Sequence, residues 1–151
     1  MLEVLEQFRI VFKSIRRHYQ SVERRAGISG AQLWALAQVA GRPGVTVGDL
    51  AKSLAIHQST ASNLLRRLEG LGLVARQRRG KDQRVVALFA TPQGLKVLKR
   101  APQPLSGVLQ QALSDLPVGN LQVLRRELRK LIAAMRTKDL EAARATPLSD
   151  I

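Results

Sequence analysis

The sequence of 151 residues contains no cysteine. This absence excludes disulfide bonds, thiolate metal sites and sensing by cysteine oxidation. Long hydrophobic runs are missing too, since no stretch approaches the roughly 18 consecutive apolar residues that a membrane-spanning helix requires. Two early acids, Glu3 and Glu6, stand where a secretory signal would have its apolar run. We therefore expect a protein that remains in the cytoplasm and has no membrane partner.

Acidic residues are scarce, with 11 Asp and Glu against 25 Lys and Arg, and the formal net charge is +14. Such an excess destabilises a compact chain by self-repulsion unless an anionic partner neutralises it. Nucleic acid is the first candidate for that partner. Apolar residues make up 45% of the sequence, which is enough to fill a core and argues against disorder.

The residue patterns of common enzyme sites are also missing. The chain has two histidines, His18 and His57, which lie far apart in the sequence. It contains neither an HExxH pair nor a glycine-rich phosphate loop. We therefore predict no enzymatic activity, no metal and no cofactor.

Helical patterns dominate what is present. The first segment has apolar residues at steps of three and four, the spacing of one helix face: Leu5, Phe8, Phe12, Ile15, Tyr19 and Val22. Gly27 ends this helix. Ser29 and Gln32 have the spacing of a capping box, which opens a second helix that Pro43 and its flanking glycines stop.

Two short helices come next, joined by a tight turn. The first begins at a Thr46 cap and ends near Ala55, and the second runs from Ser59 to Leu71. Leucines gather on one side of the second helix, and its other side is polar: Ser59, Thr60, Ser62, Asn63, Arg66 and Arg67. This arrangement predicts a helix-turn-helix whose polar side contacts DNA in the major groove. The alternative is an ordinary solvated helix face.

A basic hairpin lies beyond these helices in the sequence. Residues 73–78 and 84–90 suit β-strands, and five basic residues in this region are opposed only by Asp82: Arg76, Arg78, Arg79, Lys81 and Arg84. The alternative is a solubilising turn, but like charges on one tip repel each other. We predict a wing whose Arg78, Arg79, Lys81 and Arg84 contact phosphates or the minor groove.

The C-terminal part is again helical. Thr91 and Pro92 form a helix start, and the prolines at 102 and 104 interrupt the helical pattern beyond it. A last helix carries an apolar stripe: Leu121, Leu124, Leu128, Leu131 and Met135. A helix-turn-helix folds without such stripes, so we expect both terminal helices to pair across a homodimer, through Leu5, Phe8, Phe12, Leu121, Leu124, Leu128 and Leu131. Packing of both stripes within one chain is the alternative.

The expected fold is mainly α with a small β-hairpin wing, a winged helix-turn-helix joined to a helical dimerisation region. We expect a dimerisation helix at residues 1–28 and the DNA-binding domain at 29–91. Further dimerisation helices span residues 92–138. Residues 139–151 carry little pattern and are expected to form a flexible tail.

The sequence resembles the MarR family of bacterial winged-helix regulators. The matching positions are residues 32–36, 50–51, 59–60, 66–69, 72–74, 76, 82–84 and 91–94. The resemblance implies that Arg84 enters the minor groove, oriented by Asp82, and that Ser59, Thr60, Ser62 and Asn63 contact bases and phosphates. It also implies interlocked terminal helices and a small-molecule effector, for which Phe12, Tyr19 and Trp34 are loose candidates. His57, Asn63 and Ala90 depart from the residues common in the family.

The expected function is therefore sequence-specific recognition of double-stranded DNA by a homodimeric transcription regulator on a pseudo-palindromic operator. A repressor released by a small ligand fits this expectation. One alternative is an architectural, nucleoid-type protein that uses the same basic surface without sequence preference. Another is a helical protein whose basic face binds an acidic partner or a membrane.

Overall fold

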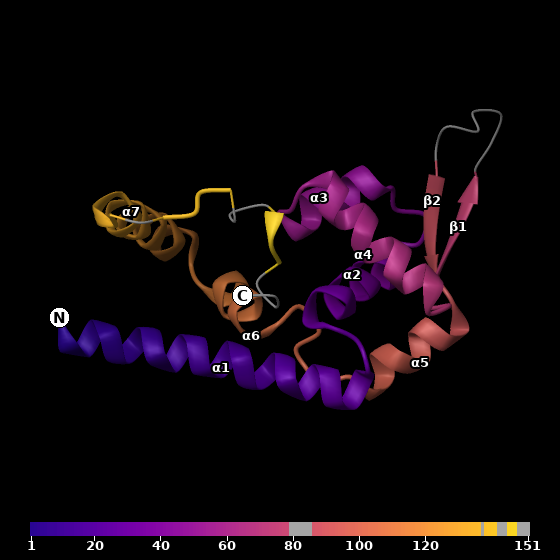
Figure 1. Cartoon of the computed structure of the whole chain (residues 1–151), viewed down its shortest axis with the longest axis horizontal. Helices are drawn as coiled ribbons and strands as arrows, with labels where there is room; N and C mark the ends of the chain where they lie inside the picture. Colours follow the sequence, from indigo (N-terminus) through magenta and orange to yellow (C-terminus); the bar gives the residue numbers. More distant parts are fainter. Residues whose placement is uncertain (79–85, 137, 142–144, 148–151) are drawn as a thin grey trace.

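Local sequence signals set the ends of most helices in the computed structural model, which describes residues 1–78, 86–136, 138–141 and 145–147. The fold is mainly α with one antiparallel hairpin, which confirms the predicted winged helix-turn-helix class (Figure 1). In chain order, the elements are α1 (Leu2–Ala26), α2 (Gly30–Gly41), α3 (Val47–Leu54), α4 (Gln58–Gly70), β1 (Val74–Arg78), β2 (Val86–Ala90), α5 (Pro92–Arg100), α6 (Val108–Asp115) and α7 (Val118–Ala134).

The predicted helix caps form as the sequence indicates. Gly27 closes α1 in the left-handed region at φ 73°, where a residue without Cβ is favoured. Both bonds of the capping box at Ser29 are present, since the serine side chain accepts from the backbone of Gln32 and the glutamine side chain accepts in return. Thr46 and Thr91 each make a single capping bond, since their side chains accept from the backbone N–H of Asp49 and Gly94 at the starts of α3 and α5. These bonds satisfy amides that helix starts leave free.

The core lies between α2 and the helix-turn-helix. Its largest fully buried side chains come from α2, α3, α4 and β2: Leu33, Leu36, Val39, Leu50, Leu65, Leu68 and Leu88, with Val22 from α1. Leu64, Leu65 and Leu68, predicted to face inward, are buried here, whereas Leu71, predicted to join them, lies just after the end of α4 and is exposed. Burial of each large aliphatic side chain contributes roughly 1.5–3 kcal/mol, so this cluster fixes how α4 is presented.

The hairpin is anchored to the helical lobe on one side. β1 and β2 pair from Val74 with Ala90 to Arg78 with Val86. The loop after α2 adds a short third pairing, because Gly44 N donates to Leu88 O at 2.8 Å and Leu88 N donates to Val45 O at 3.0 Å. The base of the hairpin is therefore held to the loop that leads into α3.

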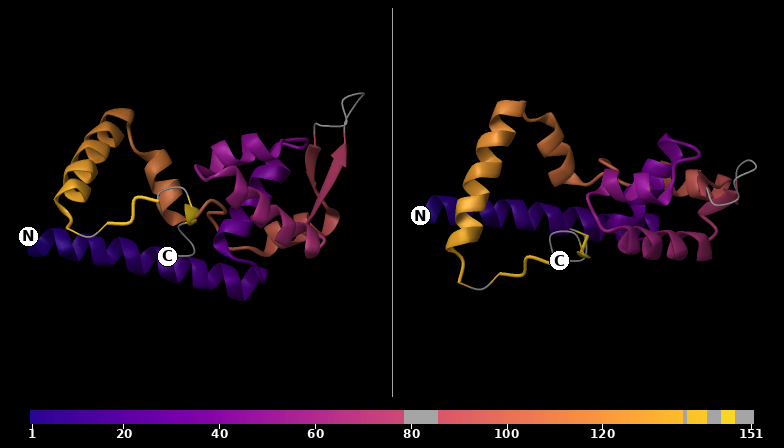
Figure 2. Two further views of the ribbon diagram at one scale, coloured as in Figure 1. Left: turned by 45° about the horizontal axis from the view of Figure 1, so that its top comes forward. Right: turned by 90° about the horizontal axis from the view of Figure 1, so that it is seen from above.

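The terminal helices extend away from this lobe. α1 runs along one side of the molecule, and α7 stands apart from the lobe near the N-terminal half of α1 (Figure 2). Neither α6 nor α7 has a buried residue. Tyr19 and Val22 are buried in the chain's own core, but the N-terminal half of α1 is exposed, with Phe12 at 63%. None of the described helices is both long enough and apolar enough to cross a membrane.

The sequence analysis did not predict α6. Its residues come after Gly107, which caps the helix without a side-chain bond, and the eight-residue segment mixes apolar and polar positions. Contacts with α1 hold it in place, among them a hydrogen bond of 3.2 Å from Gln110 Nε2 to Tyr19 Oη. Tertiary packing, rather than a local signal, therefore defines this helix.

Candidate nucleic-acid interface

The outer side of α4 presents the polar residues that the sequence singled out. Ala61, Leu64, Leu65 and Leu68 are buried. On the other side Ser59, Asn63, Arg66 and Arg67 are exposed, and Thr60 and Ser62 are half-buried. The structure therefore brings these six candidate side chains together on one helix, as the 3.6-residue period requires.

Two of these side chains are joined by a hydrogen bond. Arg66 Nη1 donates to Asn63 Oδ1 at 3.1 Å, one helical turn away. This bond orients the guanidinium along the helix and leaves its other N–H groups directed outward. A guanidinium fixed in this way is suited to a phosphate or to the acceptor edge of a guanine.

The start of α4 is less firmly capped than the starts of α2, α3 and α5. His57 occupies the N-cap position, and its side chain makes no capping bond. The backbone amides of the first turn therefore remain available to an anion. A phosphate near this helix start would meet both free amides and the positive end of the helix dipole.

The hairpin is linked to α4 by an ion pair. Arg76 Nε of β1 lies 2.7 Å from Glu69 Oε1 of α4, and both side chains are about one-third exposed. Arg76 was counted among the five basic residues of the wing, but this pair directs it towards the helix. Its charge therefore orients the hairpin relative to α4, while Arg78 remains exposed at the end of β1.

The tip of the wing lies outside the residues that the structure describes. This region holds Arg79, Lys81, Asp82 and Arg84, so their predicted DNA contacts and the orienting role of Asp82 stay predictions. β1 and β2 extend away from α1, on the side of the molecule where α3 and α4 lie (Figure 1). α4 and β1 are in direct contact.

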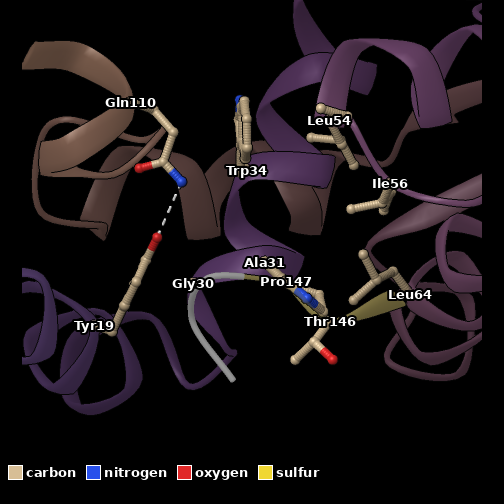
Figure 3. A pocket seen from close by; sticks show the side chains of 11 residues that line it. Tyr19, Gly30, Ala31, Trp34, Leu54, Ile56, Leu64, Gln110, Thr146 and Pro147 are labelled. Atoms are coloured by element: carbon tan, nitrogen blue, oxygen red, sulfur yellow. Dashed lines mark hydrogen bonds between the residues drawn. The ribbon is translucent and has the colours of Figure 1, made fainter. Parts of the chain in front are cut away.

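A cavity of 310 Å³ lies behind the helix-turn-helix (Figure 3). It is lined mainly by apolar side chains from α2, α3, α4 and the turn between α3 and α4: Ala31, Trp34, Leu54, Ala55, Ile56 and Leu64. Tyr19 and Gln110 lie at one end, joined by their hydrogen bond. Two of the loose effector candidates, Tyr19 and Trp34, therefore line the cavity, and Phe12 does not.

Among residues 1–78, 86–136, 138–141 and 145–147, no three His, Asp or Glu side chains are placed to share a metal ion. His18 is buried against Tyr19, and its Nε2 has no hydrogen-bond partner. Burial lowers the pKa of His18, and a hydrogen bond with the backbone of Pro104 opposes this shift.

The apolar stripes of the terminal helices are open to solvent. Leu5, Leu124, Leu128 and Leu131 are exposed, and Phe8 and Leu121 are half-buried. Exposed apolar patches of this kind are typical of surfaces that interact with another molecule.

Three features of this region were not predicted from the sequence. They are the pair between Arg76 and Glu69, the position of Gln110 in the cavity, and a contact between Thr60 and Ala145. Each joins residues from different elements, so no local spacing could have indicated it. Glu69 next to a run of arginines was the one available hint.

Known proteins share both the sequence pattern and the fold. The profile of the MarR family matches residues 26–85. The HTH-type transcriptional repressor MdtR of Bacillus subtilis (strain 168) is 27% identical over 94 residues, which cover 62% of this chain and 61% of MdtR. The chain thus matches about three fifths of the length of this curated relative.

Solved structures match over more of the chain. The transcriptional regulator BldR from Sulfolobus solfataricus is 26% identical, with a TM-score of 0.57, over 89% of this chain and 95% of BldR. MepR of S. aureus, solved as a complex with DNA, is 24% identical, with a TM-score of 0.59, over 85% of this chain and 93% of MepR. The model of the MarR family thus matches residues 26–85, the region that contains the helix-turn-helix and the hairpin.

Proposed function

We propose that this protein is a transcription regulator that binds double-stranded DNA as a homodimer. The observation that carries the proposal is the common placement of the polar side of α4 and the basic hairpin next to it. One helix fits the major groove, and an arginine-rich hairpin suits the adjacent phosphates or minor groove. The formal charge of +14 supports a polyanionic partner.

Each proposed contact has a distinct role. Ser59, Thr60, Ser62 and Asn63, at the start of α4, meet base edges and nearby phosphates. Arg66 and Arg67 lie further along the same helix, and Arg78, Arg79, Lys81 and Arg84 extend the contact along the backbone. Asp82 orients Arg84. Phosphate contacts of this kind fix position, and the few base contacts determine sequence preference.

The dimer rests on the two exposed apolar stripes. We propose that the N-terminal half of α1 and the stripe of α7 pack against their counterparts in a second copy, within dimerisation regions at residues 1–28 and 92–138. The single chain exposes Leu5, Phe12, Leu124, Leu128 and Leu131. Their burial between two copies would stabilise the dimer. A two-fold axis then sets the two α4 helices about one DNA turn, roughly 34 Å, apart.

Repression and its release can both arise from this geometry. A dimer on a promoter excludes the polymerase, and MdtR of B. subtilis is named as a repressor. An apolar ligand in the 310 Å³ cavity would release DNA only if it bound the DNA-free arrangement more tightly. Small aromatic compounds can be tested by thermal shift and then by loss of the operator complex. Compounds that raise the melting temperature without weakening that complex would rule out such control.

Selection from a random duplex library tests the central claim. The purified full chain should enrich a pseudo-palindrome with half-sites about one helical turn apart. Unlabelled random duplex at moderate salt should then compete for the selected site at least about a thousandfold less well than the site itself.

The same experiment separates the other candidate functions. Equal competition by random duplex would identify an architectural protein without operator preference. Failure to bind any duplex at low salt would favour a helical protein with an acidic partner or a membrane surface.

A further inference from the structure

A short C-terminal segment lies against the helix proposed to read DNA. Residues 145–147 sit beside the helix-turn-helix, far from α7 in space (Figure 1). Thr60 Oγ1 of α4 donates to the backbone oxygen of Ala145 at 3.2 Å. The two residues are 85 positions apart in the sequence. The segment therefore accepts the hydroxyl proton of Thr60, a side chain that contacts DNA in the proposed function.

The same segment fills space between α4 and the cavity. Thr146 and Pro147 are half-buried. They line the 310 Å³ cavity next to Ala31 and Leu64 (Figure 3), and with Ala145 they line a second hollow of 280 Å³ beside Thr60, Asn63 and Arg67. One stretch of backbone thus covers both the apolar cavity and one edge of the DNA-facing side of α4.

The charge of this region differs from that of the rest of the chain. From Asp139 onward the sequence holds three of the 11 acidic residues, Asp139, Glu141 and Asp150, and one of the 25 basic residues, Arg144. An acidic stretch is attracted to the basic face that phosphates would otherwise occupy. Charge and packing therefore favour the same location.

We propose that residues 145–147 act as an internal competitor of DNA. The inference rests on the proposed DNA-binding function. A duplex that reaches Thr60 and Arg67 must displace Ala145 and Thr146, because the Thr60 hydroxyl has a single proton to donate and the segment occupies the space. Displacement of Pro147 also opens the cavity, so the state of the cavity and the affinity for DNA are coupled through this segment.

The single tryptophan gives a direct measurement of the covered state. Trp34 is the only tryptophan in the chain and lines the cavity with Thr146 and Pro147. Two variants detach the segment: a stop after Lys138, and Pro147→Gln in the full-length chain, which leaves the net charge unchanged. Leu140→Ser is the matched control, because Leu140 is 67% exposed and lines neither cavity.

The expected result has two parts. Acrylamide should quench Trp34 more strongly in both detached variants than in the wild type and in Leu140→Ser. Both detached variants should bind duplex DNA about threefold more tightly or better, which corresponds to a wild type with roughly two thirds of its molecules covered. Binding that tightens only in the shortened chain would reflect its lost negative charge and would overturn competition by packing.

The outcomes also separate this inference from the proposed function. Unchanged Trp34 quenching in both variants overturns the covering of the cavity, whether or not DNA binds. Increased quenching with unchanged or weaker DNA affinity overturns competition while the proposed function stands. Failure of every variant to bind any duplex at low salt overturns the proposed function itself, and competition with it.

Discussion

At the scale of single residues, position along a helix decides what a side chain can do. Thr60, Asn63 and Arg66 lie on the outer side of α4 because the intervening leucines are drawn into the core. Their hydrogen bonds in the structure differ: Arg66 donates to Asn63, whereas Thr60 donates to the backbone of Ala145. Side chains on the same face therefore differ in how readily they can bind DNA.

Substitution of Arg84 tests whether the hairpin contacts DNA as a wing. Arg84→Ala should weaken binding to the selected duplex by about 1–3 kcal/mol and lower the slope of log K against log salt by about 1, because one phosphate-neutralising charge is lost. Titrations of fluorescent duplex at several salt concentrations measure both quantities. Arg100→Ala, at the end of α5, is the control. Unchanged affinity in Arg84→Ala would show that the wing is assigned wrongly.

His18 should make stability depend on pH. Burial lowers the pKa of His18 below its usual value of 6.5, so below that pH the unfolded chain takes up a proton that the folded chain resists. The contribution to stability is complete above pH 6.5 and is lost as the pH falls through the folded pKa. Urea unfolding between pH 7.5 and 5.5 should show a steeper loss in the wild type than in His18→Gln.

His57→Gln serves as the control for this measurement, because His57 is exposed at the start of α4. It should retain the pH dependence of the wild type. The same slope in the wild type and in His18→Gln would exclude His18 as its source.

At the scale of elements, close backbone approaches fix how the helices meet the hairpin. α5 begins beside the turn between α4 and β1, where Thr91 N donates to Leu73 O at 3.0 Å and Thr91 Oγ1 donates to Gly72 O at 2.6 Å. Gly94 in the first turn of α5 is buried. A Cβ there would press on the Leu73 carbonyl oxygen and come within 3.1 Å of Leu36 Cδ1.

Gly94→Ala should therefore destabilise the fold. Neither the backbone of Leu73 nor the buried Leu36 can move freely, so overpacking should cost about 1–3 kcal/mol of unfolding free energy. Urea denaturation of the full chain measures this loss. Gly41→Ala is the matched control, because no atom lies within 4 Å of its added Cβ. A loss no larger than that of the control would contradict the close contact.

Much of the element pattern could be predicted from the sequence, and particular residues show why. Ser29, Thr46 and Thr91 act on amides within three positions, so their spacing is sufficient to place α2, α3 and α5. The face of α4 is set by its period. α6 could not be predicted because it is short, mixes apolar and polar positions and lacks a side-chain cap, and the pairing of Arg76 with Glu69 depends on how a strand and a helix pack.

At the scale of the whole molecule, the chain has a packed lobe and extended terminal helices. The lobe buries its leucines, whereas α7 buries no residue and α1 is exposed along its N-terminal half. In the proposed dimer, a second copy would cover the exposed stripes. DNA binding and assembly are then linked, because a monomer retains only half of the proposed phosphate contacts.

Substitution of Leu128 tests the proposed link between dimer assembly and DNA binding. Leu128→Glu places a charge within the α7 stripe and should convert the dimer to a monomer, because burial of an unpaired carboxylate is strongly unfavourable. Sedimentation velocity measures the mass, and affinity for the selected duplex should fall at least about tenfold through loss of the second half-site. Gln122→Glu, on the opposite side of α7, is the charge-matched control. A dimer that persists in Leu128→Glu would exclude this stripe as the interface.

The sequence alone determined the caps of α2, α3 and α5, the side of α4 that faces outward, the basic character of the hairpin and the resemblance to the MarR family. These properties depend on neighbours within a few positions or on composition, which the linear order records directly. The tertiary structure alone decided that Arg76 pairs with Glu69, that Gln110 meets Tyr19 beside a cavity, and that Ala145 lies on Thr60. Contacts between residues of different elements depend on how whole elements pack, and no local periodicity carries that information.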